Sequence, residues 1–236
     1  MAFHDPARES LAALEARVRP RRLERMREVI GQRMKGLTVV LEGLYDPGNR
    51  SAVYRSAEAF GLSEVHVVRP EAASKPHARS VSRGAEKWLR IHSHDTPEDA
   101  AAVLRAQGFR ILVADVGAAQ PLGAVDFSRR TALVFGNEHA GISDEMREAA
   151  DGAFVIPMSG FAESLNISVA AAIALSHARL ERERALGART DIDGGEAAET
   201  YERYVRLSNR WIKRIRAARS GEETDSTEDP EGQEFR

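Results

Sequence analysis

Between residues 37 and 186, short apolar and β-branched runs alternate with segments of helical periodicity. The predicted strands are 37–42, 64–68, 89–94, 109–115, 131–136 and 153–158. The predicted helices are 49–61, capped by Asn49 and closed by Gly61, together with 97–107, 143–150 and 166–186. Strands that alternate with helices are typical of an α/β domain built on a mainly parallel sheet, so we expect that fold here.

Helical appendages are predicted on both sides of this domain. Residues 1–36 form an N-terminal arm, a linker is expected over 187–198, and a second helix is expected over 199–219. The second helix carries an apolar stripe at spacings of three and four, made of Tyr204, Leu207, Trp211 and Ile215. This stripe must be buried, either on the body of the same chain or on a second copy. We expect its aromatic residues to pack rather than to stack on nucleic acid bases.

The distribution of charge is more informative than its total. The chain has 34 Lys and Arg against 36 Asp and Glu, for a net charge of −2. Both appendages are nevertheless basic. An acidic tail over 220–236, which we expect to be disordered, lowers the total charge without neutralising either of them locally. Two basic helices beside a nearly neutral domain fit a polyanion such as RNA. Ordinary solvated faces remain an equal alternative on charge alone.

Several classes of protein are excluded or disfavoured. The chain has no cysteine, so disulfides, thiolate nucleophiles and cysteine-ligated metals are ruled out. No apolar run is long enough to span a membrane and the N-terminus lacks a signal pattern, so we expect a cytoplasmic protein. His92 and His94 have too few companions in the sequence for a metal site, and we expect no metal. Neither GxGxxG nor a phosphate-binding P-loop motif occurs.

Three loops at the carboxyl ends of predicted strands hold the candidate chemistry, because ligands of open α/β sheets bind there. They are "EGLYDPGNR" (42–50), "FGNEHAG" (135–141) and "PMSGFAESLN" (157–166). Five polar residues in or beside these loops also have a structural explanation. Helix capping accounts for Asn49, Asn166 and Ser164, a surface ion pair for Arg55, and solvation for Glu138.

The joint arrangement of three segments is more specific than any of them alone. "NRSAVYR" (49–55), "LVFGNEHAGIS" (133–143) and "IPMSGFAESLNISVAAA" (156–172) resemble motifs 1, 2 and 3 of the SpoU (TrmH) family of RNA ribose 2′-O-methyltransferases. "SRGAEKW" (82–88) also resembles a family segment between motifs 1 and 2. The resemblance covers about residues 20 to 186.

The resemblance implies a SPOUT-type fold for residues 37–186, with a C-terminal trefoil knot that holds S-adenosylmethionine. It also implies a homodimer. Gly136, Ile156 and Leu165 would contact the cofactor mainly through the backbone. Small residues in these loops would let the chain pass close to itself and to the ligand. Relatives often have a polar residue near Ala114, where alanine leaves any contact to the main chain.

The resemblance further implies a catalytic set, which consists of Asn49, Arg55, Glu138, Ser164 and Asn166. Arginine stays protonated in proteins, so we expect Arg55 to clamp a phosphate and stabilise the developing alkoxide rather than act as a base. Glu138 is the alternative proton acceptor. The other three residues would position groups by hydrogen bonds, even where they also cap a helix.

The short basic arm resembles the tRNA members of the family, which modify guanosine 18 of the D-loop. We therefore expect tRNA as substrate, with RNA contacts from Arg19, Arg21, Arg22 and Arg25. Two alternatives stay open. The substrate could be ribosomal RNA, or the protein could bind RNA without catalysis.

Overall fold

The computed structural model describes residues 9–44, 46–68, 84–137 and 140–220. The chain divides into two compact units, one within residues 1–31 and 193–236 and the other formed by residues 32–192. The expected disordered tail over 220–236 lies, apart from Ser220, outside the described residues.

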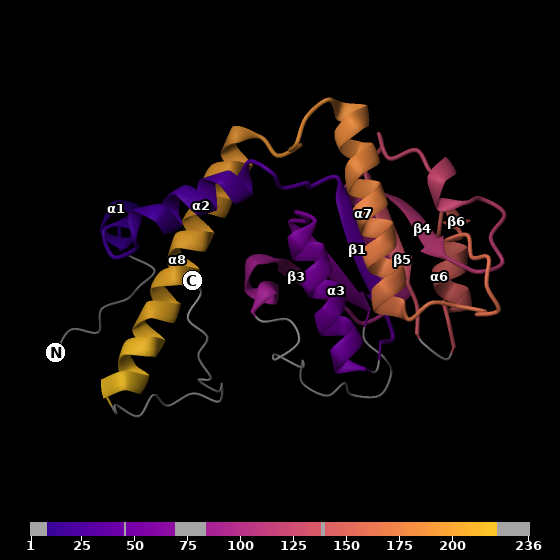
Figure 1. The fold of residues 1–236 in the computed structure, drawn as a ribbon, viewed down its shortest axis with the longest axis horizontal. Coiled ribbons are helices and arrows are strands. Elements are labelled where there is room, and N and C mark those ends of the chain that lie inside the picture. Colours follow the sequence, from indigo (N-terminus) through magenta and orange to yellow (C-terminus); the bar gives the residue numbers. More distant parts are fainter. Residues whose placement is uncertain (1–8, 45, 69–83, 138–139, 221–236) are drawn as a thin grey trace. The chain divides into compact units, whose positions relative to one another are not determined.

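The unit of residues 32–192 is built on a six-stranded sheet with the order β3-β2-β1-β5-β4-β6, in which every pair of neighbours is parallel (Figure 1). This confirms the expected α/β fold. The strands are β1 (Leu37–Glu42), β2 (Glu64–Val68), β3 (Arg90–His94), β4 (Arg110–Ala114), β5 (Thr131–Phe135) and β6 (Gly152–Phe154). Only β6 is clearly shorter than predicted. Beyond it Val155 makes a single bridge to Pro121, and Pro157 has no N–H to continue a ladder.

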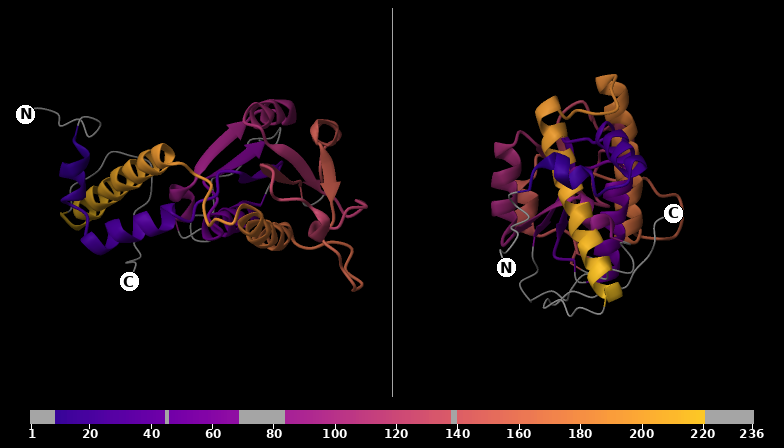
Figure 2. Two further views of the ribbon diagram at one scale, coloured as in Figure 1. Left: turned by 90° about the horizontal axis from the view of Figure 1, so that it is seen from above. Right: turned by 90° about the vertical axis from the view of Figure 1, so that its left-hand side faces the viewer.

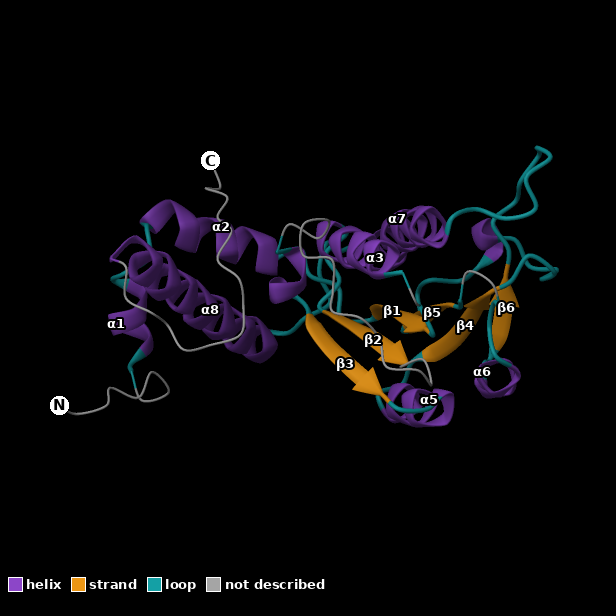
Figure 3. Ribbon diagram, turned by 90° about the horizontal axis from the view of Figure 1, so that it is seen from below, coloured by secondary structure: helices purple, strands orange, loops and turns teal. Residues whose placement is uncertain are grey.

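Helices cover both faces of this sheet (Figure 3). One face carries α3 (Pro47–Ala59) and α7 (Ile167–Leu186), and the other carries α5 (Pro97–Ala106) and α6 (Asp144–Ala149). Side chains alternate along each strand, so Val39 packs in the same cluster as residues of α3 and α7, whereas Val40 packs with α5 and α6. Two short 3-10 helices, η1 (Ala85–Trp88) and η2 (Leu122–Ala124), complete the unit. No helix within the described residues is long and apolar enough to cross a membrane.

The helix that carries the first motif begins earlier than predicted. Its N-cap is Asp46, whose carboxylate accepts a hydrogen bond of 2.7 Å from the Gly48 amide, and Pro47 occupies the first helical position. Asp followed by Pro is the stronger start signal, so the prediction of Asn49 as the cap was wrong. Asn49 lies instead within the first turn of α3. The predicted cap of α7 is confirmed, since Asn166 accepts from the Ser168 amide at 2.9 Å.

The other unit contains α1 (Leu11–Glu15), α2 (Pro20–Ile30) and α8 (Gly194–Ser220), with α8 packed against α1 and α2 (Figure 2). The helix α8 starts five residues before the predicted position 199, so the linker is shorter than predicted. The reason is local: the Asp193 carboxylate accepts from the Glu196 amide at 2.8 Å, and Glu196 reaches back to the Asp193 amide. This reciprocal pairing is a capping box.

The face of α8 that is buried differs in part from the predicted stripe. Tyr204 and Val205 are almost completely buried, whereas Leu207 is only half-buried. Asn209 is also buried and donates a hydrogen bond of 3.0 Å to the carbonyl of Leu14 in α1. Tyr204 is therefore a packing residue, as predicted, and its partner surface belongs to the same chain. The side chains of Trp211 and Ile215 lie outside the described residues.

Candidate active site at the carboxyl edge of the sheet

The loops after β1 and β5 are tied together by one asparagine. Asn137 donates from its side-chain amide to the carbonyl of Gly43 at 2.7 Å. Its backbone N–H donates to the Gly141 carbonyl at 2.8 Å, and the Gly141 N–H returns a hydrogen bond of 2.9 Å. The second motif therefore forms a closed loop that is anchored to the strand preceding the first motif. The sequence pattern alone does not indicate this role for Asn137.

At Gly136 the chain passes very close to itself. A Cβ atom built there would lie 2.2 Å from the Gly141 carbonyl oxygen and 2.6 Å from the Ile142 nitrogen, both of them backbone atoms. No side chain fits in this position without moving the loop. The close approach that small residues were expected to permit in this motif is therefore present at Gly136.

The first and third motifs meet through two asparagines. Asn166, at the start of α7, donates from its Nδ2 to the Oδ1 of Asn49 in α3 at 3.1 Å. The same side chain accepts from the amide and the hydroxyl of Ser168, at 2.9 and 2.6 Å. Two segments separated by more than a hundred residues are thus joined at the N-terminal ends of neighbouring helices.

Two further predicted catalytic residues are exposed beside this junction. Arg55 lies on α3 and Ser164 lies two residues before the cap of α7, and neither makes a hydrogen bond or ion pair with another described residue. Their side chains are accessible from solvent. Glu138, the fifth predicted catalytic residue, lies outside the described residues.

The four predicted cofactor contacts lie on adjacent segments. Ala114 ends β4, Gly136 follows β5 and Ile156 follows β6, and these three strands are neighbours in the sheet. Ala114 and Ile156 are partly buried against the cluster beneath α3 and α7, and Leu165 is half-buried before α7. Apolar side chains thus line the edge where ligands of parallel sheets bind.

The loop that joins β6 to α7 has unusually free backbone groups. Across residues 156–165, no backbone N–H or C=O makes a hydrogen bond to another described residue. Backbone polar groups in proteins are ordinarily satisfied by protein, water or ligand. This segment, which borders Gly136 and Ala114, can therefore offer several donors and acceptors to a polar ligand.

Further ionisable groups, which the sequence patterns did not indicate, lie on or beside the segments that form this site. Asp115, directly after Ala114, forms an ion pair with Arg147 of α6, and this hydrogen bond lowers the pKa of the carboxyl group. On α3, Tyr54 is fully buried, and burial raises the pKa of its hydroxyl to about 12 even though the nearby Arg50 opposes the shift. Both Arg50 and Tyr54 are buried inside the first motif, where sequence periodicity does not distinguish them from surface residues.

The predicted RNA-binding arginines of the helical unit differ in their surroundings. Arg19 and Arg21 are exposed and make no ion pair or hydrogen bond through their side chains with another described residue. Arg25 pairs on the surface with Glu28 at 3.0 Å. Arg22 is half-buried and donates to the Ser208 hydroxyl at 3.3 Å, and burial lowers its pKa. The first two are the most accessible for an external anion.

A group of potential metal ligands lies on other strands. His92, which seemed to lack companions in the sequence, lies beside Glu64 and His66. This group is not visible in the sequence because its members come from two strands paired in the sheet.

Comparison with known proteins identifies similar chains. Residues 36–176 match the model of the SpoU rRNA Methylase family. The tRNA (guanosine(18)-2′-O)-methyltransferase of Escherichia coli K12 is 37% identical over 167 residues, which is 70% of this chain and 72% of the relative. The Aquifex aeolicus TrmH/SpoU tRNA modifying enzyme is 30% identical, with a TM-score of 0.72 over 83% of this chain and 98% of that chain. The SpoU methyltransferase AviRb from Streptomyces viridochromogenes, solved with AdoMet, is 30% identical, with a TM-score of 0.57 over 66% of this chain and 61% of that chain.

Proposed function

Because the chain belongs to the SpoU rRNA methylase family, we propose that it methylates the ribose 2′-hydroxyl of guanosine 18 in tRNA, with S-adenosylmethionine as methyl donor. The observation that carries the proposal is the hydrogen bond between Asn49 and Asn166, which joins the first and third motifs at the carboxyl edge of the sheet. The E. coli relative named for this reaction supports the choice of substrate.

The proposed cofactor site fits the residues present. The free backbone groups of 156–165 can bind the polar parts of the cofactor, and the apolar edge formed by Ala114, Ile156 and Leu165 can bind its adenine. S-adenosylmethionine supplies an electrophilic methyl group on a sulfonium. Gly136 lets the loop after it fold directly back beside this edge, because a side chain there would meet the backbone of Gly141.

The catalytic work that we assign to the chain is alignment and charge stabilisation. Holding a nucleophile in line with its target contributes about 7–11 kcal/mol in well-oriented reactions. Arg55 is exposed and unpaired among the described residues, so its guanidinium can bind the phosphate next to the target ribose and stabilise the developing alkoxide. We assign proton acceptance to Glu138, and positioning hydrogen bonds to Asn49, Ser164 and Asn166.

We assign initial RNA binding to the helical unit. Arg19 and Arg21 are exposed, and a phosphate can bind each without displacing an existing ion pair. Arg25 would first have to leave Glu28, and Arg22 contributes more to packing against α8. The tRNA substrate also implies that the enzyme works in the cytoplasm.

We further propose that the protein is a knotted homodimer. Support for the dimer comes from α7, on which Val169, Ile173 and Leu180 are 47%, 40% and 53% exposed. Their spacings of four and seven place them on one helix face, and an apolar stripe of this kind typically marks a contact surface. Light scattering should give about twice 25.9 kDa for the wild type. Ile173→Lys should give a monomer, whereas Val103→Lys, at an equally exposed residue of α5, should leave the mass unchanged.

The reaction is tested with two tRNA transcripts that differ in one atom. Tritiated S-adenosylmethionine should label a transcript with guanosine at position 18 and leave its 2′-deoxyguanosine counterpart unlabelled. Equal labelling of the two would refute the proposed site of methylation. Calorimetry with the cofactor and its demethylated product, with and without a chelator, tests the binding step separately.

The same labelling and calorimetry experiments distinguish two alternatives. The first is that the substrate is ribosomal RNA, which is supported by the family's name and by a 34%-identical 23S rRNA methyltransferase from Acinetobacter baylyi. In that case only rRNA fragments would be labelled. An RNA-binding protein without catalysis would bind tRNA but give no calorimetric signal with the cofactor.

A further inference from the structure

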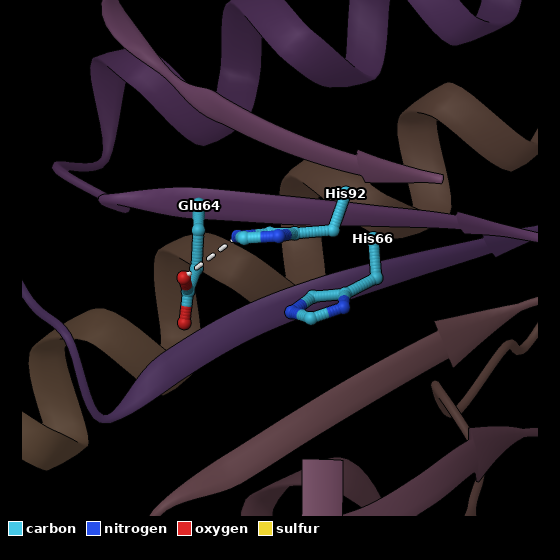
Figure 4. Close-up of side chains that lie close together, drawn as sticks. All are labelled: Glu64, His66 and His92. Carbon is cyan, nitrogen blue, oxygen red and sulfur yellow. Dashed lines mark hydrogen bonds and ion pairs between the residues drawn. The ribbon is translucent and has the colours of Figure 1, made fainter. Parts of the chain in front are cut away.

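A carboxylate and three imidazoles occupy one face of β2 and β3. The parallel register pairs His66 with His92 and Val68 with His94, so alternate residues of both strands point to the face that α5 covers. Glu64 lies two residues before His66 on this face. Figure 4 shows the rings of His66 and His92 extending to the same side as the Glu64 carboxylate.

The side chains in this cluster are close and mutually oriented. His92 Nε2 and Glu64 Oε2 are 3.0 Å apart, and one ligand atom from each of Glu64, His66 and His92 lies within 4.8 Å of the others. The rings of His66 and His92 stack with their centroids 4.8 Å apart and their planes 20° from parallel. The three side chains are thus held close together. An imidazole binds a metal in the plane of its ring, so the two stacked rings would have to turn toward each other to share one ion.

His66 has one ring nitrogen without a partner. Its Nδ1 lies 2.9 Å from Nε2 of His94, whereas its Nε2 is buried and makes no hydrogen bond to another described residue. The residue as a whole is 0% exposed. A buried polar atom without a partner is costly, typically about 1–3 kcal/mol, and needs an explanation.

The charged groups around the cluster act in opposite directions. The Glu64 carboxylate, 3.0 Å from His92, attracts a cation. Arg130 interacts electrostatically with that carboxylate and would oppose a metal, and its guanidinium lies over the ring of Phe109, 4.4 Å from the ring centroid.

We propose that Glu64, His66 and His92 bind a divalent transition metal, with zinc as the preferred ion. Two imidazole nitrogens and one carboxylate oxygen form a known type of zinc ligand set, and water would complete the coordination. His94 would orient His66 through its Nδ1 contact, as outer partners of metal-bound histidines do. The side chain of His92 is 37% exposed, which provides a path for entry. This site goes beyond the proposed methyl transfer, whose residues lie on other elements.

Metal binding would replace the hydrogen bond between His92 and Glu64. Both atoms of that bond would become ligands, and His92 would bind as the neutral tautomer that carries its proton on Nδ1. Nε2 of His66 would gain the partner that it lacks. The sequence-based expectation of no metal rested on the spacing of His92 and His94 alone and did not take the neighbouring strand into account.

The test uses the full-length, untagged protein after treatment with a chelator. Cobalt(II) is titrated and its visible d–d bands are recorded, and zinc(II) is then titrated by calorimetry. We expect saturable binding of one ion per chain, with zinc displacing cobalt. Glu64→Gln and His92→Ala should each weaken the affinity by at least about tenfold, since loss of even an outer partner costs 10–100-fold.

The matched control is His177→Ala, which removes a histidine from α7 outside the cluster and should leave affinity unchanged. Circular dichroism confirms that the variants are folded, which we expect because Glu64→Gln preserves shape and His92 is partly exposed. Absence of saturable one-to-one binding would overturn the proposal. So would wild-type affinity in both folded variants. Neither readout depends on methyl transfer, so failure here leaves the proposed function untouched.

Discussion

Replacing Gly136 by alanine tests whether the close approach of the second motif is required for cofactor binding. The new Cβ would lie 2.2 Å from the Gly141 carbonyl oxygen, far inside normal contact. The obstacle is backbone on both sides and cannot rotate away. To reach ordinary contact distance, the segment from Gly141 must move by about 1 Å or more.

The size of the effect follows from what that movement breaks. Asn137 and Gly141 exchange two backbone hydrogen bonds, of 2.8 and 2.9 Å, each worth about 0.5–1.5 kcal/mol. Overpacking in well-packed regions costs about 1–3 kcal/mol. These costs overlap, because movement that relieves the clash loses the bonds. We therefore expect Gly136→Ala to destabilise the protein by about 1–3 kcal/mol. A displacement of 1 Å at a reaction site can lower a rate about 100-fold.

Gly123→Ala in η2 is the matched control, because a Cβ there meets no atom within 4 Å. Urea unfolding, calorimetry with the cofactor and single-turnover methylation are measured for both variants. We expect the control to behave as wild type and Gly136→Ala to lose stability, cofactor affinity and rate together. If Gly136→Ala is destabilised but binds the cofactor normally, the loop is structural and our cofactor assignment at Gly136 is wrong.

Three other predictions follow from the described side chains. Arg55→Ala should nearly abolish turnover at saturating RNA and leave stability and cofactor affinity unchanged. The control is Arg129→Ala, which removes an exposed arginine near the amino end of β5 and should keep normal turnover. Changing Arg19 and Arg21 to Gln should weaken tRNA binding and reduce the slope of log affinity against log salt by roughly 0.7–0.9 per lost phosphate contact, and an unchanged slope would exclude both arginines as phosphate ligands. Burial lowers the pKa of His66 to about 4, below its unfolded value, so the free energy of unfolding should hold its full value above pH 6.5 and fall by up to about 3 kcal/mol toward pH 4. Urea unfolding in the presence of a chelator should show this pH dependence in the wild type and not in His66→Gln.

The middle of the sheet was predictable because β1, β2 and β5 are buried along their whole length. Residues 37–42 read as one apolar run, and β1 has the predicted bounds because both of its faces are covered by helices. The start of α3 was not predicted, since Asp46 and Asn49 are both good caps and only the adjacent Pro47 distinguishes them. Local sequence signals therefore predict the presence of a helix or strand more reliably than they predict its first and last residues.

Contacts between distant segments were the part that sequence could not supply. The apolar stripe of α8 required a partner, but nothing in the order of residues indicated that α1 and α2 would provide it. Likewise His92 is two residues from His94 in sequence, yet the neighbours that change its chemistry, Glu64 and His66, come from strand pairing. Register in a parallel sheet is decided by burial of whole strands, so single polar residues within them carry little advance signal.

Capping and chemistry at the third motif do not compete, because they use different atoms of one side chain. Oδ1 of Asn166 accepts from Ser168 and starts α7, while Nδ2 donates to Asn49 across the motif junction. Serine or aspartate caps a helix as well as asparagine does, but neither carries an amide donor at Nδ2. Asparagine is therefore favoured here by the pair of contacts and not by the cap alone. The structural explanation of Asn166 as a helix cap is correct, but it accounts only for Oδ1. The hydrogen bond from Nδ2 to Asn49 needs a separate explanation, and the proposed function provides one.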